Sequence, residues 1–303
     1  EKILTIDKKQ IIPVIFRLNG YYLTKEEIKL IKSNLIFGFI FFERNIKSIN
    51  QLKSLINHIK NLCDHKPIIM IDHEGGRVNR FNKIFDQSRY NAAFFSKLYR
   101  KDKIKFQKYF NFFTNFNINL FKYLGINTVA YPVLDLKYNK THNVIGDRAF
   151  SNSVNLFKII SNLFIQKYQN YKISCIAKHA PGHGLATLDS HIKLPIVNET
   201  KSYLLNNDFK CFDNVKSNFL MTAHIKYKNF DNEIATYSKK IINLLKKQYK
   251  FNGLIMTDDI CMKALKGPLY KKVSQPLIAG CDIILHCDGN IDEMKKIISI
   301  LTL

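Results

Sequence analysis

Short runs of apolar and β-branched residues recur along the chain and are separated by longer polar segments. Eight such runs end at turn-forming residues, and they lie at residues 11–16, 37–42, 68–71, 127–131, 173–177, 219–221, 254–256 and 283–285. Strands of a parallel sheet are buried on both faces, so they are expected to be continuously apolar rather than alternating. The runs therefore predict eight parallel strands.

Helical periodicity fills most of the intervals between these runs. The segments with helical spacing of apolar residues are 23–32, 49–61, 151–168, 238–249 and 290–301. Thr24 stands before Glu26 and Glu27, as at a capped helix N-terminus. Eight strands alternating with helices predict a (β/α)8 TIM-type barrel, and we expect one domain over residues 1–303. The alternative is a doubly wound open sheet, but no G-x-G-x-x-G sequence follows the first run.

Polar clusters directly follow five of the predicted strands. They lie at residues 72–77, 132–135, 178–191, 222–224 and 257–259. In a barrel all of these positions meet at the C-terminal mouth, where active sites lie. Together they would form a pocket of carboxylates, histidines and cations. Such a pocket suits glycosyl transfer to water, although aldolases and phosphate-binding barrels have similar rims.

The carboxylates in these clusters also have structural interpretations. Asp72 and Glu74 could cap the following helix and pair with Arg77 or Arg80, and Gly75 and Gly76 could serve a tight turn that needs positive φ. Asp258 and Asp259 could be an N-cap pair for a helix that begins near residue 260. Two adjacent acids point in different directions, so we expect only one of them to face the mouth.

The histidines raise the alternative of a metal site. His183, His191 and His224 could be ligands, but their spacing matches no zinc template. His179 and His183 are four residues apart, yet Pro181 and Gly182 between them exclude a helix. We therefore expect no metal and no cofactor. A carboxylate two residues from an imidazole, as Asp189 is from His191, can instead fix the tautomer of that imidazole.

Composition narrows the class of protein further. The 47 basic and 24 acidic side chains give a formal charge of +23. The excess is mostly lysine spread along the chain, which is typical of solvated surfaces, so we expect no specific nucleic-acid partner. The six cysteines show no zinc-type pairing and several lie in apolar runs, which indicates buried free thiols in a reducing compartment. No signal peptide and no membrane-spanning stretch of about 18 apolar residues is visible, so we expect a cytoplasmic protein.

Several longer motifs resemble those of family 3 glycoside hydrolases, specifically the bacterial β-N-acetylhexosaminidases of cell-wall recycling. The matching segments are GFIFFERNI (38–46), IDHEGGRVNRF (71–81), YPVLDL (131–136), IGDRAFS (145–151), KHAPGHGLATLDSHIKLPIV (178–197), MTAH (221–224), GLIMTDDICMKAL (253–265) and AGCDIILHC (279–287). They cover nearly the whole chain in order. The combination of K-H-x-P-G-H-G with D-S-H is the most specific of them.

The resemblance implies a role for individual residues. Asp258 corresponds to the nucleophile, His191 to the general acid/base, and Asp189 to the partner of that histidine. The residues implied in sugar binding are Asp72, Arg80, Arg148, Lys178 and His179. Many relatives carry a second domain that supplies an acid/base carboxylate; this sequence ends soon after its eighth predicted strand, so the D-S-H loop is expected to provide the proton donor. Thr257 stands where serine is usual, and Leu185-Ala186 replace a more polar pair.

The implied reaction is the retaining removal of terminal non-reducing N-acetylglucosamine from muropeptides, including the disaccharide with 1,6-anhydro-N-acetylmuramic acid. A monomer that needs no cofactor is expected. One alternative is a glycoside phosphorylase, because a histidine acid does not repel incoming phosphate as a carboxylate would. Another alternative, of a different class, is a catalytically silent basic binding protein.

Overall fold

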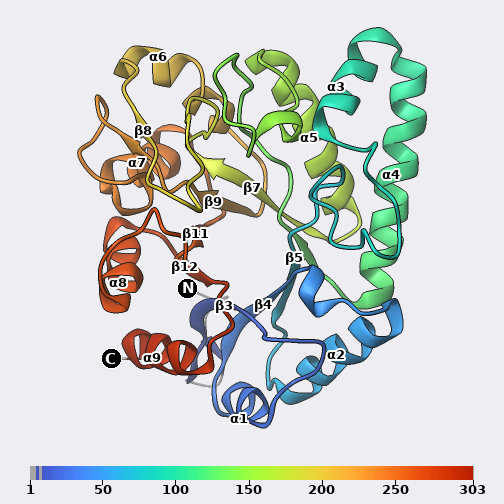
Figure 1. Cartoon of the computed structure of the whole chain (residues 1–303), viewed down its shortest axis with the longest axis vertical. Coiled ribbons are helices and arrows are strands. Elements are labelled where there is room, and N and C mark those ends of the chain that lie inside the picture. The colour runs from blue at the N-terminus through green and yellow to red at the C-terminus, as the bar shows by residue number, and fades with distance from the viewer. Residues whose placement is uncertain (1–4, 7–8, 303) are drawn as a thin grey trace.

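All eight predicted runs form strands of one closed parallel barrel (Figure 1). The computed structural model describes residues 5–6 and 9–302. The barrel strands are β3 (Ile12–Arg17), β4 (Ile36–Phe41), β5 (Ile68–Ile71), β6 (Thr128–Val129), β7 (Ser174–Ala180), β9 (Phe219–Thr222), β11 (Leu254–Asp259) and β12 (Ile283–His286). Their order around the barrel follows the chain, and β12 closes the ring by pairing with β3. The predicted (β/α)8 fold is confirmed.

Alternate strand residues divide the core into two layers. Ile15, Ile40 and Leu285 belong to a cluster that fills the barrel interior. Phe16 and Phe39, their chain neighbours, belong to the larger cluster between strands and helices. Because each strand is covered on both sides, apolar residues are required at every position, and this explains the continuous runs in the sequence.

Helices surround the strands on the outside of the barrel (Figure 1). They are α1 (Lys25–Ser33), α2 (Ile49–Leu62), α3 (Ala92–Lys101), α4 (Lys103–Leu124), α5 (Val154–Asn170), α6 (Lys201–Asn206), α7 (Lys239–Asn243), α8 (Leu269–Ala279) and α9 (Ile291–Leu301). Thr24 caps α1 as predicted, in a full capping box with Glu27. The last helix, α9, packs beside the first, α1 (Figure 1).

Four of these helices, α3, α4, α6 and α8, were not among the predicted segments. The 22-residue α4 carries aromatic residues around most of its circumference, including the exposed Phe112, so it has no sharp apolar stripe. α8 contains Pro276, which is unfavourable inside a helix. Tertiary packing overrides the local pattern in both cases.

Shorter elements complete the chain. Two pairs of two-residue strands lie outside the barrel: β1 (Thr5–Ile6) with β2 (Lys9–Gln10), and β8 (Ile196–Val197) with β10 (Lys226–Tyr227). The single-turn 3-10 helices are η1 (Glu43–Asn45), η2 (Gly146–Arg148), η3 (Phe209–Phe212) and η4 (Ala235–Tyr237), and η5 (Leu244–Gln248) is a π-helical continuation of α7.

The structure also tests two expectations drawn from composition. All six cysteines are free thiols, of which Cys175, Cys211 and Cys281 are buried and the other three are half-buried. Within residues 5–6 and 9–302, no helix combines the length and the apolar character needed to cross a bilayer.

Candidate active site

A cavity of about 480 Å³ lies at the carboxyl ends of the barrel strands. Seven of the eight residues singled out in the sequence line it: Asp72, Arg80, Arg148, Lys178, His179, His191 and Asp258. The eighth, Asp189, bonds to one of these seven. The barrel therefore brings together groups that are far apart in the sequence, as the strand pattern predicted.

Asp258 lies near the end of β11 and, like its neighbour Asp259, lines the cavity. Its Oδ1 accepts a hydrogen bond from the backbone N–H of Asp259 at 2.8 Å. Burial opposes ionisation, but His179 and His224 outweigh it and hold the pKa of Asp258 below its usual value. Asp258 is therefore an anion at neutral pH, as a carboxylate nucleophile must be.

Asp259 does not cap a helix, so that interpretation is wrong. Residues 260–265 form turns, and the next helix, α8, begins at Leu269. Oδ1 of Asp259 accepts from the backbone N–H groups of Cys261 and Cys287, at 3.0 and 2.9 Å. This carboxylate thus ties the turn after β11 to the end of β12.

His191 and Asp189 form a bonded pair on the loop after β7. The Nδ1 of His191 lies 2.8 Å from Oδ1 of Asp189, which also accepts from the His191 backbone N–H at 2.9 Å. These bonds overcome partial burial and lower the pKa of Asp189 below its usual value. Because Nδ1 bonds to Asp189, Nε2 is the ring nitrogen left for other partners. The side chain of His191 is 65% exposed, so the imidazole is accessible to water.

The loop that carries this pair is anchored at both ends. Near its start, the Tyr227 hydroxyl donates to the carbonyl of Gly182, and Thr141 donates to the carbonyl of Gly184 at 2.7 Å. A Cβ on Gly184 would lie 2.2 Å from the carbonyl oxygen of Leu136, so only glycine fits there. Near its end, the carbonyl of Ser190 accepts from the backbone of Ala264, in the segment that follows Asp258. The loop therefore lies against the turn after β11.

A buried network of opposite charges forms one wall of the cavity. Nζ of Lys178 lies 2.6 Å from Oδ1 of Asp72 and 2.7 Å from Oε1 of Glu74. Arg148 donates to Glu74 through two nitrogens, each at 2.8 Å, and Arg80 pairs with Asp72. Burial opposes ionisation of both acids, but the cations lower the pKa of Asp72 well below its usual value and that of Glu74 to about 2.

This wall contains two kinds of residue, those that hold other side chains in place and those that face the cavity. Glu74 is buried and satisfied by cations, so it holds Arg148 and Lys178 in place. Asp72 and Arg80 are more exposed, with 15% and 25% of their side chains accessible, and they face the cavity. The expected pairing of Asp72 with a nearby arginine is present, yet both residues also line the cavity.

His179 is oriented by a buried carboxylate that the sequence placed in a cluster but did not single out. Its Nδ1 lies 2.7 Å from Oδ2 of Asp135, and Oδ1 of Asp135 accepts from the backbone N–H of His183 at 2.7 Å. Asp135 is fully buried. The signal in the sequence that could have identified Asp135 as a site residue was its position in a polar segment directly after a strand.

Other lining residues were not singled out as site residues in the sequence. Arg17, Phe42, Arg77 and Cys287 line the cavity from strand ends or from the turn after β5. Phe42 stacks with the guanidinium of Arg80, 5.1 Å from the ring centroid. The sequence contains no tryptophan, and Phe42 places an aromatic ring at the cavity.

Two of the histidines considered as metal ligands have protein partners. His224 is buried with Nδ1 2.7 Å from the Thr236 hydroxyl and Nε2 3.0 Å from the Asp259 carbonyl, so both ring nitrogens are engaged. His183 is also buried, and its Nε2 lies 3.3 Å from the Ser190 hydroxyl. Burial lowers the pKa of His183 to about 4. Hydrogen bonds within the protein therefore hold both of these histidines in place.

Comparisons with known proteins identify the family of this chain. The family model described as "Glycosyl hydrolase family 3 N terminal domain" matches residues 6–303. A β-hexosaminidase of Glaesserella parasuis is 31% identical over 282 residues, which are 91% of this chain and 80% of that protein. A β-hexosaminidase of Haemophilus influenzae is 30% identical over 295 residues, which are 95% of this chain and 82% of that protein.

The fold comparison gives the same family. The crystal structure of NagZ from Neisseria gonorrhoeae in complex with N-trifluoroacetyl-D-glucosamine superposes with a TM-score of 0.86 at 28% identity. The alignment covers 95% of this chain and 84% of that one. The chain therefore belongs to glycosyl hydrolase family 3 and is a β-N-acetylhexosaminidase of that family.

Proposed function

We propose that this enzyme is a retaining exo-β-N-acetylglucosaminidase that uses Asp258 as nucleophile and His191 as general acid/base. The observation that carries this proposal is one cavity lined by both residues, with the Asp258 carboxylate ionised and the His191 imidazole held by Asp189. Double displacement at an anomeric carbon needs a carboxylate on one side of the bond and a proton donor on the other.

In the first step, an Asp258 oxygen attacks the anomeric carbon while the bond to the leaving oxygen breaks. His191 gives its proton to that oxygen, and a covalent glycosyl-aspartate forms. In the second step, His191 takes a proton from water as the water oxygen attacks the same carbon. The Asp258 carboxylate is then released, and N-acetylglucosamine leaves with its original anomeric configuration. Asp189 keeps the imidazole in its orientation through both steps.

The charged wall of the cavity is proposed to hold the sugar. Asp72 and Arg80 face the cavity and can bind hydroxyl groups, and Lys178 lies between Asp72 and Glu74. His179 is fixed by Asp135, which leaves its other ring nitrogen for the substrate. Arg148 has two nitrogens on Glu74 and a third on the Val144 carbonyl, so it contributes mainly by holding the wall rigid.

Muropeptides are the proposed natural substrates, with N-acetylglucosamine linked to 1,6-anhydro-N-acetylmuramic acid as the simplest case. Arg17 and Arg77 add positive charge at the cavity, which suits a substrate that carries peptide carboxylates. A role in peptidoglycan recycling and a cytoplasmic location follow from this substrate. The expectations of a monomeric protein without cofactor or specific nucleic-acid partner are retained in this proposal.

The deciding experiment compares hydrolysis of an aryl β-N-acetylglucosaminide with that of the matching β-glucoside, followed by assay of the anhydro-disaccharide. We expect turnover of the N-acetylated substrates only. Product analysis with and without phosphate tests the phosphorylase alternative, which a histidine proton donor favours; a sugar 1-phosphate product would establish it. Failure to cleave any of these substrates would support the silent binding protein instead.

A further inference from the structure

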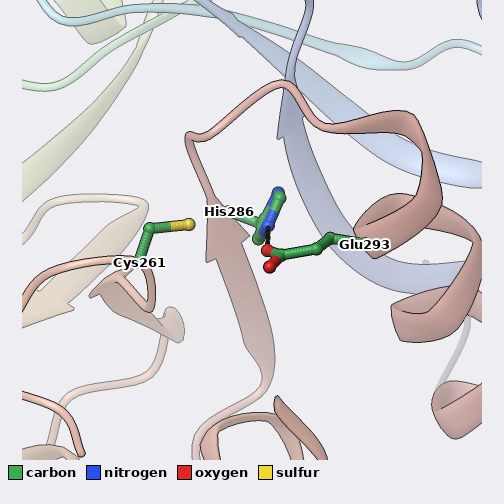
Figure 2. A group of neighbouring side chains, drawn as sticks. All are labelled: Cys261, His286 and Glu293. Atoms are coloured by element: carbon green, nitrogen blue, oxygen red, sulfur yellow. Dashed lines mark hydrogen bonds and ion pairs between the residues drawn. The ribbon is translucent and has the colours of Figure 1, made fainter.

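Three metal-ligating side chains meet outside the candidate active site. They are Cys261 from the turn after β11, His286 at the end of β12, and Glu293 in the first turn of α9 (Figure 2). One ligand atom from each lies within 4.8 Å of the other two. Figure 2 shows the Cys261 sulfur directed toward the imidazole, with Glu293 reaching it from the helix.

This cluster lies on the outer side of the barrel wall. Leu285 lines the cavity, and its neighbour His286 points the opposite way, with its ring edge-on to Phe16 at 5.9 Å between centroids. None of the three cluster residues lines the cavity with Asp258. The cluster is therefore separate from the groups assigned to glycoside cleavage.

The histidine of the cluster is incompletely satisfied by the protein. His286 is fully buried, and its Nε2 lies 2.8 Å from Oε2 of Glu293. Its Nδ1 is buried without a hydrogen-bond partner among the described protein groups. A buried imidazole normally uses both nitrogens, so this ring has bonding capacity that Glu293 alone does not meet.

We propose that Cys261, His286 and Glu293 form a binding site for Zn²⁺ or a similar borderline divalent ion. Sulfur, imidazole nitrogen and carboxylate oxygen together are the donors that zinc prefers, whereas Mg²⁺ and Ca²⁺ prefer oxygen alone. Ligand atoms of a tetrahedral zinc ion lie roughly 3.5 Å apart. The present ligand atoms lie within 4.8 Å of one another, so they would have to approach by up to about 1.3 Å to reach that spacing.

The site is open to ions from solvent on one side. The Glu293 side chain is 42% exposed and Cys261 is half-buried, while His286 forms the closed wall. Three protein ligands leave one position of the tetrahedron for water.

Occupancy of the site would join three segments at the back of the candidate active site. Cys261 lies three residues after Asp258, and Asp259 already ties its turn to the end of β12 through Cys287. A metal ion would add a second connection between the same strand ends and would extend it to α9. Because the ion would lie outside the cavity, its effect would be to stabilise the segment that carries Asp258.

Cobalt(II) is the probe that tests the site, because thiolate coordination gives an intense near-ultraviolet charge-transfer band. The full chain, purified with chelator and reductant, is titrated with Co²⁺ and then with Zn²⁺. We expect one equivalent of Co²⁺ to bind with this band, Zn²⁺ to displace it, and saturating Zn²⁺ to raise Tm by roughly 5 °C.

Matched variants locate the ligands. Cys261→Ser should abolish the band, and Glu293→Gln, which keeps a hydrogen-bonding group beside His286, should weaken Co²⁺ binding at least tenfold. Cys63→Ser, just after the end of α2, is the control and should change neither the charge-transfer band nor the affinity for Co²⁺. The proposal is overturned if no thiolate band appears, or if the band survives Cys261→Ser. It is also overturned if binding is lost only in His191→Ala, since the ion would then occupy the cavity of the proposed glycosidase.

Discussion

The carboxylate of Asp135 lies 2.7 Å from Nδ1 of His179, deep behind the cavity that the imidazole faces. Burial opposes ionisation of Asp135, but His179 outweighs it and lowers the pKa of the acid. Asp135 also accepts the backbone N–H of His183, at the start of the loop that carries His191. One buried acid thus sets both the orientation of His179 and the path of the chain toward His191.

Replacing Asp135 with alanine is expected to destabilise the protein by roughly 3 kcal/mol, since it leaves buried donors of His179 and His183 without acceptors. Asp135→Asn retains one acceptor oxygen and should cost less. Urea unfolding at neutral pH measures both. An alanine variant as stable as the wild type would show that the buried contacts contribute nothing.

Asp258 and Asp259 both line the cavity, but the Asp259 carboxylate is held by two backbone N–H groups of other segments, which leads to a second prediction. Asp258→Ala should lower kcat by several orders of magnitude with little loss of stability, because its carboxylate faces the cavity. Asp259→Ala should mainly lower stability, because its Oδ1 ties Cys261 to Cys287. Trapping with a 5-fluoro N-acetylglucosaminyl donor and peptide mass mapping identifies the labelled residue. A label on Asp259 or Glu74 would refute the assignment of Asp258.

The buried ion pairs of Glu74 predict acid sensitivity. Its pKa is about 2 in the folded protein against an ordinary value of 4.5, because Arg148 and Lys178 outweigh the effect of burial. A depressed carboxyl pKa contributes stability above the ordinary value, and this contribution is lost as pH falls from about 4.5 to about 2. Within that window we expect a loss of roughly 1.4 kcal/mol per pH unit from this group. In Glu74→Gln, the unfolding free energy measured from pH 7 to pH 3 should fall less steeply with decreasing pH than in the wild type. An unchanged pH dependence would exclude Glu74 as the source of this loss.

Asp208 predicts the opposite dependence. It is buried, and burial raises its pKa to about 7 despite a hydrogen bond donated by the Tyr138 hydroxyl. A raised carboxyl pKa contributes stability at low pH, and this contribution is lost as pH rises from about 4 to about 7. Asp208→Asn should remove this loss and be more stable than the wild type above neutral pH. Tyr138→Phe is the matched control, since it removes the donor but keeps the acid. Equal pH profiles for wild type and Asp208→Asn would contradict the prediction.

The sequence predicted the strands well because the barrel buries them on both sides. Residues such as Ile15 and Phe16 are both buried, one inside the barrel and one beneath the helices, so the signal is a continuous run. Helix α4 was not predicted because its aromatic residues extend around to the exposed Phe112. Its position depends on packing against α3 and α5, which no local pattern contains.

The sequence predicted those site residues that belong to recognisable motifs. It did not predict the contacts between them, which arise only when the chain folds. Asp72, Lys178 and Asp258 stand at strand ends, which a barrel brings to one mouth. The bonds from Lys178 to both Asp72 and Glu74 depend on the relative height of two strands, β5 and β7, and therefore on register. The contact between Cys261 and His286 arises in the same way, from the pairing of β11 with β12.

The proposed proton donor, His191, gives the last prediction, which depends on the leaving group. An aryl oxygen of low pKa leaves without much help, whereas a sugar oxygen must be protonated as its bond breaks. His191→Ala should therefore slow glycosylation by the anhydro-disaccharide far more than glycosylation by an activated aryl β-N-acetylglucosaminide. Pre-steady-state measurements isolate this step from the later attack of water. Asp189→Ala should show the same pattern more weakly, because it removes the 2.8 Å bond that orients the imidazole and leaves the imidazole present. If both substrates lost the same factor in His191→Ala, the histidine would not be the acid, and another group at the cavity would have to supply the proton.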